Sequence, residues 1–282
     1  MKHSRREFLI RSASSMALTS AAIGAAPKHI PIGLELYSVR NELKADLMGT
    51  VRDVAKLGYE CVEFFSPYFA WTPDYAREVR TQLDGLGINC YSTHNGMESF
   101  SEKGMAHAIE LNKILGCKYV ILAHPGRVSG LDDWKRVATA LNASIEPLKS
   151  AGMRPGYHNH EIEFKDTDGK KPMEVLMSAT DHAVALQVDV GGCLQGGGDP
   201  VALIKKHPGR VPSLHCKEYS DDPKKGFRVL IGEGIAPWKK IIEAAEKTGG
   251  VEYYLVEQEG ADIPPLETAA KCLANFKKIR GE

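Results

Sequence analysis

The sequence has no excess of charge of either sign, because 36 lysines and arginines balance 36 aspartates and glutamates. A chain of zero net charge lacks the basic field that attracts a protein to nucleic acid or to an anionic membrane. It also lacks a membrane-spanning run, since the weakly apolar stretch 16–26 is too short and too mildly hydrophobic. No cysteine lies in that stretch to carry a lipid. We therefore expect neither a nucleic-acid partner nor a membrane anchor.

Cysteine pairs at Cys-X-X-Cys spacing are also absent. Most of the cysteines lie in or beside expected strands, where small buried apolar side chains are their usual role. The six are Cys61, Cys90, Cys117, Cys193, Cys216 and Cys272. Nothing in their spacing indicates a disulfide.

The first residues are typical of an export signal and not of a fold. The run Ser4-Arg5-Arg6-Glu7-Phe8-Leu9 is close to the twin-arginine pattern, and an apolar segment that ends in small residues follows it. We expect a signal peptide at residues 1–26, cleaved near 22–26, with the twin-arginine export machinery as partner. That route carries folded proteins, which predicts a periplasmic enzyme. The alternative interpretation is an arbitrary arginine pair before a hydrophobic patch.

From residue 30 to 282, short apolar runs alternate with amphipathic stretches, without a linker or a compositional break. Eight such pairs predict a single (β/α)8 TIM barrel, because strand–helix alternation gives parallel strands and about 250 residues suit one barrel. The expected strands are 32–38, 61–65, 88–94, 119–124, 154–160, 183–190, 211–217 and 253–257. The expected helices are 47–57, 73–86, 102–115, 131–150, 173–178, 200–206, 237–247 and 265–279. We expect the glycines between residues 191 and 198 to form a flexible loop after the sixth strand.

Polar residues stand at the expected carboxyl ends of these strands, where such a barrel builds its site. They are Glu63, His94, His124, His158, His160, Asp189, His215, Lys217 and Glu257. His158 and His160 would share one face of the fifth strand, because alternate side chains point the same way. The chain therefore gathers acids and imidazoles at one mouth.

Three of these residues, Asp189, His215 and Glu257, form a mixed nitrogen and oxygen donor set with a fourth ligand from the fifth strand. The set suits one divalent ion, Mn, Zn, Co or Mg. The residues alone leave His158, His160 or Glu161 as the fourth ligand. An ion at a hydroxy-ketone would acidify the adjacent C–H bond, and a nearby base would move the proton.

The remaining polar residues allow two interpretations each. Lys217 either binds an oxyanion in the mouth or is a surface lysine. His94 and His124 either contact substrate or a second metal, or bond to backbone carbonyl groups. We expect catalytic roles for Glu257, His160 and Lys217, and substrate contacts for His94, His124 and Glu63.

Several short motifs between residues 30 and 280 occur together. They are Leu36-Tyr37-Ser38-Val39-Arg40, Gly58-Tyr59-Glu60-Cys61-Val62-Glu63, Tyr157-His158-Asn159-His160 with Glu163-Phe164, Asp189-Val190-Gly191, Asp199-Pro200, His215-Cys216-Lys217-Glu218, Gly232-Glu233-Gly234 and Val256-Glu257. Together they resemble the xylose isomerase-like barrel superfamily, which holds sugar isomerases and epimerases, inosose dehydratase and endonuclease IV.

The resemblance implies a metal site on strands five to eight. Relatives bind the ion through Glu, Asp, His and Glu, which implies Asp189, His215 and Glu257 here. The fifth-strand glutamate falls on His158, a departure that questions the exchange of protons between two carboxylates in the epimerases. Gly192 also departs, because many relatives place a substrate-contacting side chain there. His94 and His124 match the extra zinc ligands of endonuclease IV, but a neutral exported protein suits DNA repair poorly.

These observations support three hypotheses about function. The first is a metal-dependent isomerase or epimerase of a free sugar or sugar derivative. The second is a lyase or dehydratase of the same barrel, acting on an inosose or a 3-keto-glycoside. The third is a sugar-binding barrel without catalysis, motivated by the missing glutamate. All three take a small carbohydrate as partner, and assembly as a homo-oligomer is left open.

Overall fold

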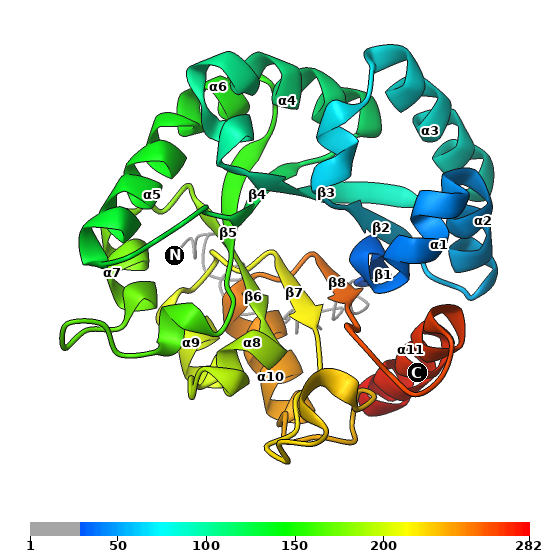
Figure 1. The fold of residues 1–282 in the computed structure, drawn as a ribbon. Coiled ribbons are helices and arrows are strands. Elements are labelled where there is room, and N and C mark those ends of the chain that lie inside the picture. Colours follow the sequence, from blue (N-terminus) through cyan, green and yellow to red (C-terminus); the bar gives the residue numbers. More distant parts are fainter. Residues whose placement is uncertain (1–28) are drawn as a thin grey trace, which may run out of the picture.

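The computed structural model describes residues 29–282, and the expected signal peptide lies outside this range. Eight parallel strands close into a barrel in sequence order, with helices around it (Figure 1). The strands are β1 Ile32–Glu35, β2 Cys61–Phe64, β3 Asn89–Gly96, β4 Tyr119–His124, β5 Arg154–His158, β6 Ala185–Asp189, β7 Ser213–Cys216 and β8 Tyr253–Val256. The predicted (β/α)8 barrel is confirmed.

Helices connect each strand to the next. They are α1 Arg40–Ala45, α2 Leu47–Lys56, α3 Pro73–Leu86, α4 Glu102–Leu115, α5 Leu131–Ala143, α6 Ile145–Ser150, α7 Pro172–Ala179, α8 Val190–Gln195, α9 Pro200–Lys206, α10 Trp238–Ala244 and α11 Pro265–Arg280. Single turns of 3-10 helix follow four strands, at η1 Leu36–Val39, η2 Ser66–Ala70, η3 Met97–Phe100 and η4 Ile162–Phe164. Within residues 29–282, none of these helices is long and apolar enough to cross a bilayer.

Apolar side chains fill two regions. The larger lies between the sheet and the surrounding helices, and a smaller cluster fills the barrel interior. The interior is tight at β5, where a Cβ on Gly156 would lie 2.4 Å from Ile121 Cδ1. Glycine at this position therefore lets the barrel close around its own side chains. All six cysteines are free and buried, as predicted.

Glycine and aspartate define several helix ends. Gly58, Gly87, Gly116 and Gly152 adopt positive φ angles, which glycine reaches without steric cost. Asp199 caps α9 by accepting hydrogen bonds from two backbone N–H groups. Helix stops and starts of this kind fix where each strand begins, and so set the register of the barrel.

Two expectations about elements were wrong. The single helix predicted for 131–150 is broken at Ser144 into α5 and α6, because Pro147 has no N–H to donate to the carbonyl four residues earlier. The flexible loop predicted after the sixth strand begins instead as α8, which Asp189 caps by accepting the Gly192 N–H. The Asp189 cap therefore stabilises a first helical turn in this glycine-rich segment.

Candidate active site

Most of the predicted strand-end residues meet in the buried mouth of the barrel. Seven of these side chains are at most 8% exposed: Glu63, His94, His158, Asp189, His215, Lys217 and Glu257. His160 lies two residues past the end of β5 and is half-buried, while His124 is exposed. Charged groups buried this deeply persist only when they are paired, so hydrogen bonds and ion pairs define the site.

His215 lies at the centre of these contacts. Its Nδ1 is 2.6 Å from Glu257 Oε2, and its Nε2 is 2.7 Å from Glu63 Oε2. Burial alone would lower the pKa of His215, but hydrogen bonds to the two carboxylates outweigh it and raise the pKa to about 9. His215 is therefore an imidazolium in this arrangement, with both nitrogens donating.

Gln187 on β6 organises two more imidazoles. Its Oε1 lies 2.6 Å from His94 Nε2 and 3.0 Å from His158 Nδ1. Its Nε2 donates to Glu63 Oε1 and to Ser213 Oγ, which fixes the orientation of the amide. Because an amide oxygen only accepts, both imidazole nitrogens that face it are donors. The lone pair of His158 is thereby placed on Nε2.

The neutral form of both histidines agrees with their surroundings. Burial lowers the pKa of His94 to about 4, although the Glu63 carboxylate opposes this shift. Burial, the charge of His215 and the neighbouring His94 hold the pKa of His158 well below its usual value. The three imidazoles are packed with ring centroids 4.4 to 4.8 Å apart. Charge in this cluster is therefore confined to His215.

Three of the four predicted metal ligands converge. His158, Asp189 and Glu257 each offer one ligand atom, and these atoms lie within 4.8 Å of one another. Asp189 Oδ1 accepts the Gly192 N–H, whereas the buried Oδ2 is in contact with the ammonium group of Lys217. This oxygen lies 3.7 Å from His158 Nε2. An imidazole lone pair beside two carboxylates is a donor set that fits a divalent cation.

His215, the fourth predicted ligand, adjoins this group through its hydrogen bond to Glu257. The geometry also distinguishes among the candidate metal ligands from the fifth strand. Glu161 points to Lys165, whose Nζ lies 3.5 Å away, and is not part of the ligand cluster. His158 is the strand-five residue that faces Asp189 and Glu257.

Lys217 is 3% exposed, so the surface-lysine interpretation is wrong. Its Nζ lies 2.5 Å from Asp189 Oδ2, 2.7 Å from Glu259 Oε1 and 3.6 Å from Glu257 Oε2. Burial would lower the pKa of Lys217, but these carboxylates raise it well above its usual value. The ammonium thus balances the charge of the acids that would hold a cation.

Glu35, at the end of β1, was missed by the sequence analysis. It is fully buried, and its Oε2 has no hydrogen-bond partner among residues 29–282. Burial, followed by the charges of Glu63 and Glu257, raises the pKa of Glu35 well above its usual value. The only signal in the sequence is an acid inside an apolar strand, in Ile32-Gly33-Leu34-Glu35-Leu36.

A cavity of about 200 Å³ opens above these groups. Its lining includes Glu35, His94, His124, His158, His160 and Glu257, with Tyr37, Phe65 and Glu259. The lining does not include Glu63, Asp189, His215 or Lys217. Glu63 contacts the lining residue His94, and Lys217 contacts the lining residues Glu257 and Glu259. His124 and His160 face each other across its rim with stacked rings 5.6 Å apart.

Comparisons with known proteins agree with this architecture. Inosose dehydratase of Lacticaseibacillus casei is 26% identical over 191 residues, which are 56% of this chain and 63% of that protein. The rhizopine catabolism protein MocC of Rhizobium meliloti is 27% identical over 180 residues, 54% of this chain and 55% of that protein. The chain thus matches less than two thirds of the length of these two relatives.

Solved structures match over more of the chain. A sugar phosphate isomerase/epimerase from Parabacteroides distasonis is 25% identical with a TM-score of 0.73, and the match covers 89% of this chain and 94% of that one. The IolI protein with a bound zinc atom is 15% identical with a TM-score of 0.67, over 89% and 98% of the chains, which shows a shared fold. Residues 51–279 match the sequence profile described as the xylose isomerase-like TIM barrel. The chain belongs to the xylose isomerase-like TIM barrel family.

Proposed function

We propose that this protein is a sugar lyase. It removes a proton beside a carbonyl group and expels a hydroxyl or alkoxy substituent one carbon further on. The observation that carries the proposal is His158, a neutral imidazole where epimerisation by two carboxylates requires an acid. Neither of the nearby acids Glu161 and Glu163 lines the cavity. Proton transfer from two opposite carboxylates is therefore not available here.

The proposed metal ligands are His158, Asp189 and Glu257, with His215 beside them. A divalent ion held there would act as a Lewis acid on the sugar carbonyl. Lys217 and Gln187 are positioning residues: Lys217 balances the acids, and Gln187 keeps the His158 lone pair on Nε2. The ion remains one of Mn, Zn, Co or Mg, because two carboxylates and an imidazole suit all of them.

His160 is the proposed base. It lines the cavity and is not needed as a ligand. Burial lowers its pKa, but the Glu163 carboxylate, 3.9 Å from His160 Nδ1, outweighs this and raises the pKa above its usual value. In its neutral form, the imidazole of His160 can accept a carbon-bound proton. His124, stacked against His160 at the rim, is placed to contact the sugar.

Glu35 is the proposed acid. It lines the cavity on the side opposite β5, and burial raises the pKa of its carboxyl group, which favours the protonated form. In the elimination, His160 takes the proton from the C–H bond of the sugar. The C–O bond to the leaving group then breaks and a C=C bond forms. The proton of Glu35 passes to the leaving oxygen, which departs as water or an alcohol.

The comparisons support the lyase ahead of the isomerase. Several relatives carry the name inosose dehydratase. The isomerase hypothesis, which the sequence analysis placed first, is the second candidate here and is supported by the 25% identity to a sugar phosphate isomerase/epimerase. Isomerisation shares the first proton transfer and then returns the proton to a neighbouring carbon. We also propose that the substrate is a free sugar in the periplasm, on the strength of the twin-arginine pattern.

The test compares metal-depleted and metal-loaded protein on an inosose and on 3-keto-glycosides, with products identified by mass. A lyase releases water or an alcohol, and an isomerase gives a product of unchanged mass. We expect His160→Asn and Glu35→Gln to lose most activity, and His182→Asn, a change to an exposed histidine, to keep it. Sugar affinity without metal affinity or turnover would instead support a binding protein.

A further inference from the structure

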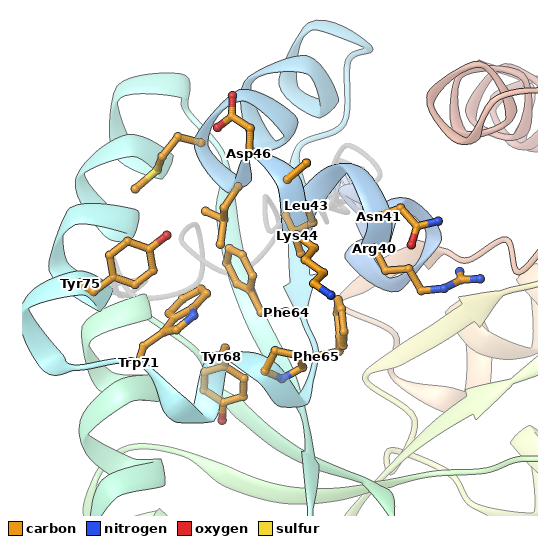
Figure 2. Close-up of a pocket in the computed structure, with 14 residues that line it drawn as sticks. Arg40, Asn41, Leu43, Lys44, Asp46, Phe64, Phe65, Tyr68, Trp71 and Tyr75 are labelled. Carbon is orange, nitrogen blue, oxygen red and sulfur yellow. The ribbon is translucent and has the colours of Figure 1, made fainter.

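A second cavity lies beside the mouth and is larger, at about 780 Å³ against 200 Å³. It is enclosed by α1, the start of α2 and the segment from β2 through η2 to α3 (Figure 2). Its volume is within the range of about 300–1,000 Å³ that is usual for small-molecule sites, whereas the mouth falls below it. The mouth holds about one sugar ring, and a larger substrate needs additional space.

The walls of this second cavity are aromatic and fixed. Figure 2 shows Trp71 and Tyr75 on one side of the open space, with Leu43 and Lys44 on the other. Trp71 packs edge-to-face on Phe64 at 5.0 Å and on Tyr75 at 5.3 Å between ring centroids. Rings locked by such contacts provide a preformed surface with little freedom to lose on binding.

The base of the cavity is equally rigid. Tyr68 is 1% exposed, and its hydroxyl group is hydrogen-bonded to the side chains of Thr93, Asn95 and Asn112. Its ring lies 6.0 Å from that of Trp71. An open, largely apolar cavity of about 780 Å³ is usual for a ligand site. The polar groups are at the edge, where Lys44 and Asp46 are exposed.

Phe65 lies between the two cavities, because it lines both of them. Its ring packs edge-to-face against Tyr37, which also lines the mouth, with centroids 5.3 Å apart. Arg40 lies over the ring of Tyr37, with its guanidinium carbon 4.4 Å from the ring centre. One molecule could therefore place a sugar in the mouth and an attached group past Phe65.

We propose that the second cavity is an aglycone subsite, which binds a flat aromatic group attached to the sugar. This inference rests on the proposed function, because it takes the sugar to be bound in the mouth. The substrate class is then a keto-sugar with an aryl substituent, and the leaving group of the elimination is an aromatic alcohol. The rings of Trp71 and Phe65 supply stacking and edge contacts, while the mouth supplies the polar contacts.

The test measures binding separately from turnover. Phenyl glucoside and methyl glucoside, which lack the keto group and are not substrates, are titrated into the full-length metal-loaded protein by calorimetry. We expect phenyl glucoside to bind at least about tenfold more tightly, a difference of about 1.4 kcal/mol. Trp71→Ala should remove this preference and leave methyl glucoside affinity unchanged. The matched control is Phe69→Ala, which changes a neighbouring ring of η2 that does not line the cavity.

A second variant distinguishes loss of the subsite from misfolding of Trp71→Ala. Leu43→Arg places a long side chain into the cavity from a partly exposed position on α1 and should also abolish the preference. Equal affinities for the two glucosides, or an equal loss of both in the variants, would overturn the subsite. So would a dimer that Leu43→Arg converts to monomer, because the cavity would then be an interface.

The outcome is separable from that of the proposed function. If the preference for phenyl glucoside holds but no keto-sugar is turned over, the subsite stands and the lyase proposal fails. If an inosose without an aryl group is dehydrated but the two glucosides bind alike, the lyase proposal stands and the subsite is wrong.

Discussion

The side-chain oxygen of Gln187 accepts from two imidazoles, and its nitrogen donates to Glu63 and Ser213. One amide thus places the His158 lone pair on the nitrogen that faces Asp189. Groups of this kind, which orient a metal ligand without touching the metal, typically change metal affinity 10- to 100-fold when removed.

Replacing Gln187 by Met keeps the approximate size and removes every one of these hydrogen bonds. We expect metal affinity to fall at least about tenfold and the free energy of unfolding to fall by about 2–3 kcal/mol, because buried polar groups lose their partners. The measurements are competition with a chelating dye and urea denaturation. Gln258→Met is the control, since Gln258 is also buried but bonds to Phe227 and Gly260 carbonyls. Equal loss of metal affinity in both variants would contradict the assigned role.

His207 gives a pH dependence that is independent of the site. Burial, together with the charges of Arg210 and Lys206, lowers the pKa of His207 to about 4. The unfolded chain binds this proton below about pH 6.5, while the folded protein resists it until about pH 4. Stability should therefore fall as pH decreases from 6.5 to 4, by at most about 1.4 kcal/mol per pH unit, and by less because solvent screens the partly exposed ring.

The measurement is the free energy of unfolding across this pH range for the wild type and His207→Gln. We expect the variant to show a shallower loss of stability between pH 6.5 and 4. His107→Gln, at a partly buried histidine of α4, controls for the removal of a ring and should follow the wild type. Parallel curves for all three proteins would refute the assignment.

At the scale of elements, α8 and the end of β5 fit together because residue 192 has no side chain. A Cβ at Gly192 would lie 3.1 Å from the Cα and the carbonyl carbon of His160. The glycine that departs from the family pattern therefore lets the helix approach the proposed base. The sequence analysis expected a flexible loop here, because the segment is rich in glycine.

Gly192→Ala should displace the His160 backbone by a few tenths of an ångström. We expect turnover to fall roughly tenfold, because small misplacements of a catalytic group cost rate, with less than about 1.5 kcal/mol of lost stability. Steady-state rates and thermal unfolding test this. Gly85→Ala is the matched control, as its Cβ would meet nothing within 4 Å in α3, and it should keep full activity and gain stability.

At the scale of the whole molecule, the barrel and the positions of its strand ends could be predicted from alternation and helix-end signals. The pairings within the mouth could not. Glu63 and His215 are 152 positions apart, and closure of the barrel alone brings them together. Glu35 and Gln187 were missed because each lies within an apolar strand, where composition hides a single inward polar side chain.

Export is also a property of the whole chain. We expect conservative replacement of both arginines, Arg5→Lys with Arg6→Lys, to retain the protein in the cytoplasm, because twin-arginine recognition depends on the pair. Cell fractionation followed by immunoblotting measures this, with a cytoplasmic marker and an unrelated exported protein as controls. Unchanged periplasmic recovery of the double variant would show that the arginine pair is not a signal.

The six thiols described above are spread from β2 to α11 and are all buried in the folded protein, and the sulfur atoms of Cys90 and Cys117 lie 3.5 Å apart. An alkylating reagent can therefore modify them only when the structure around each one opens. The chain carries six internal reporters of local opening, and the order of their labelling would rank the stability of its successive barrel segments.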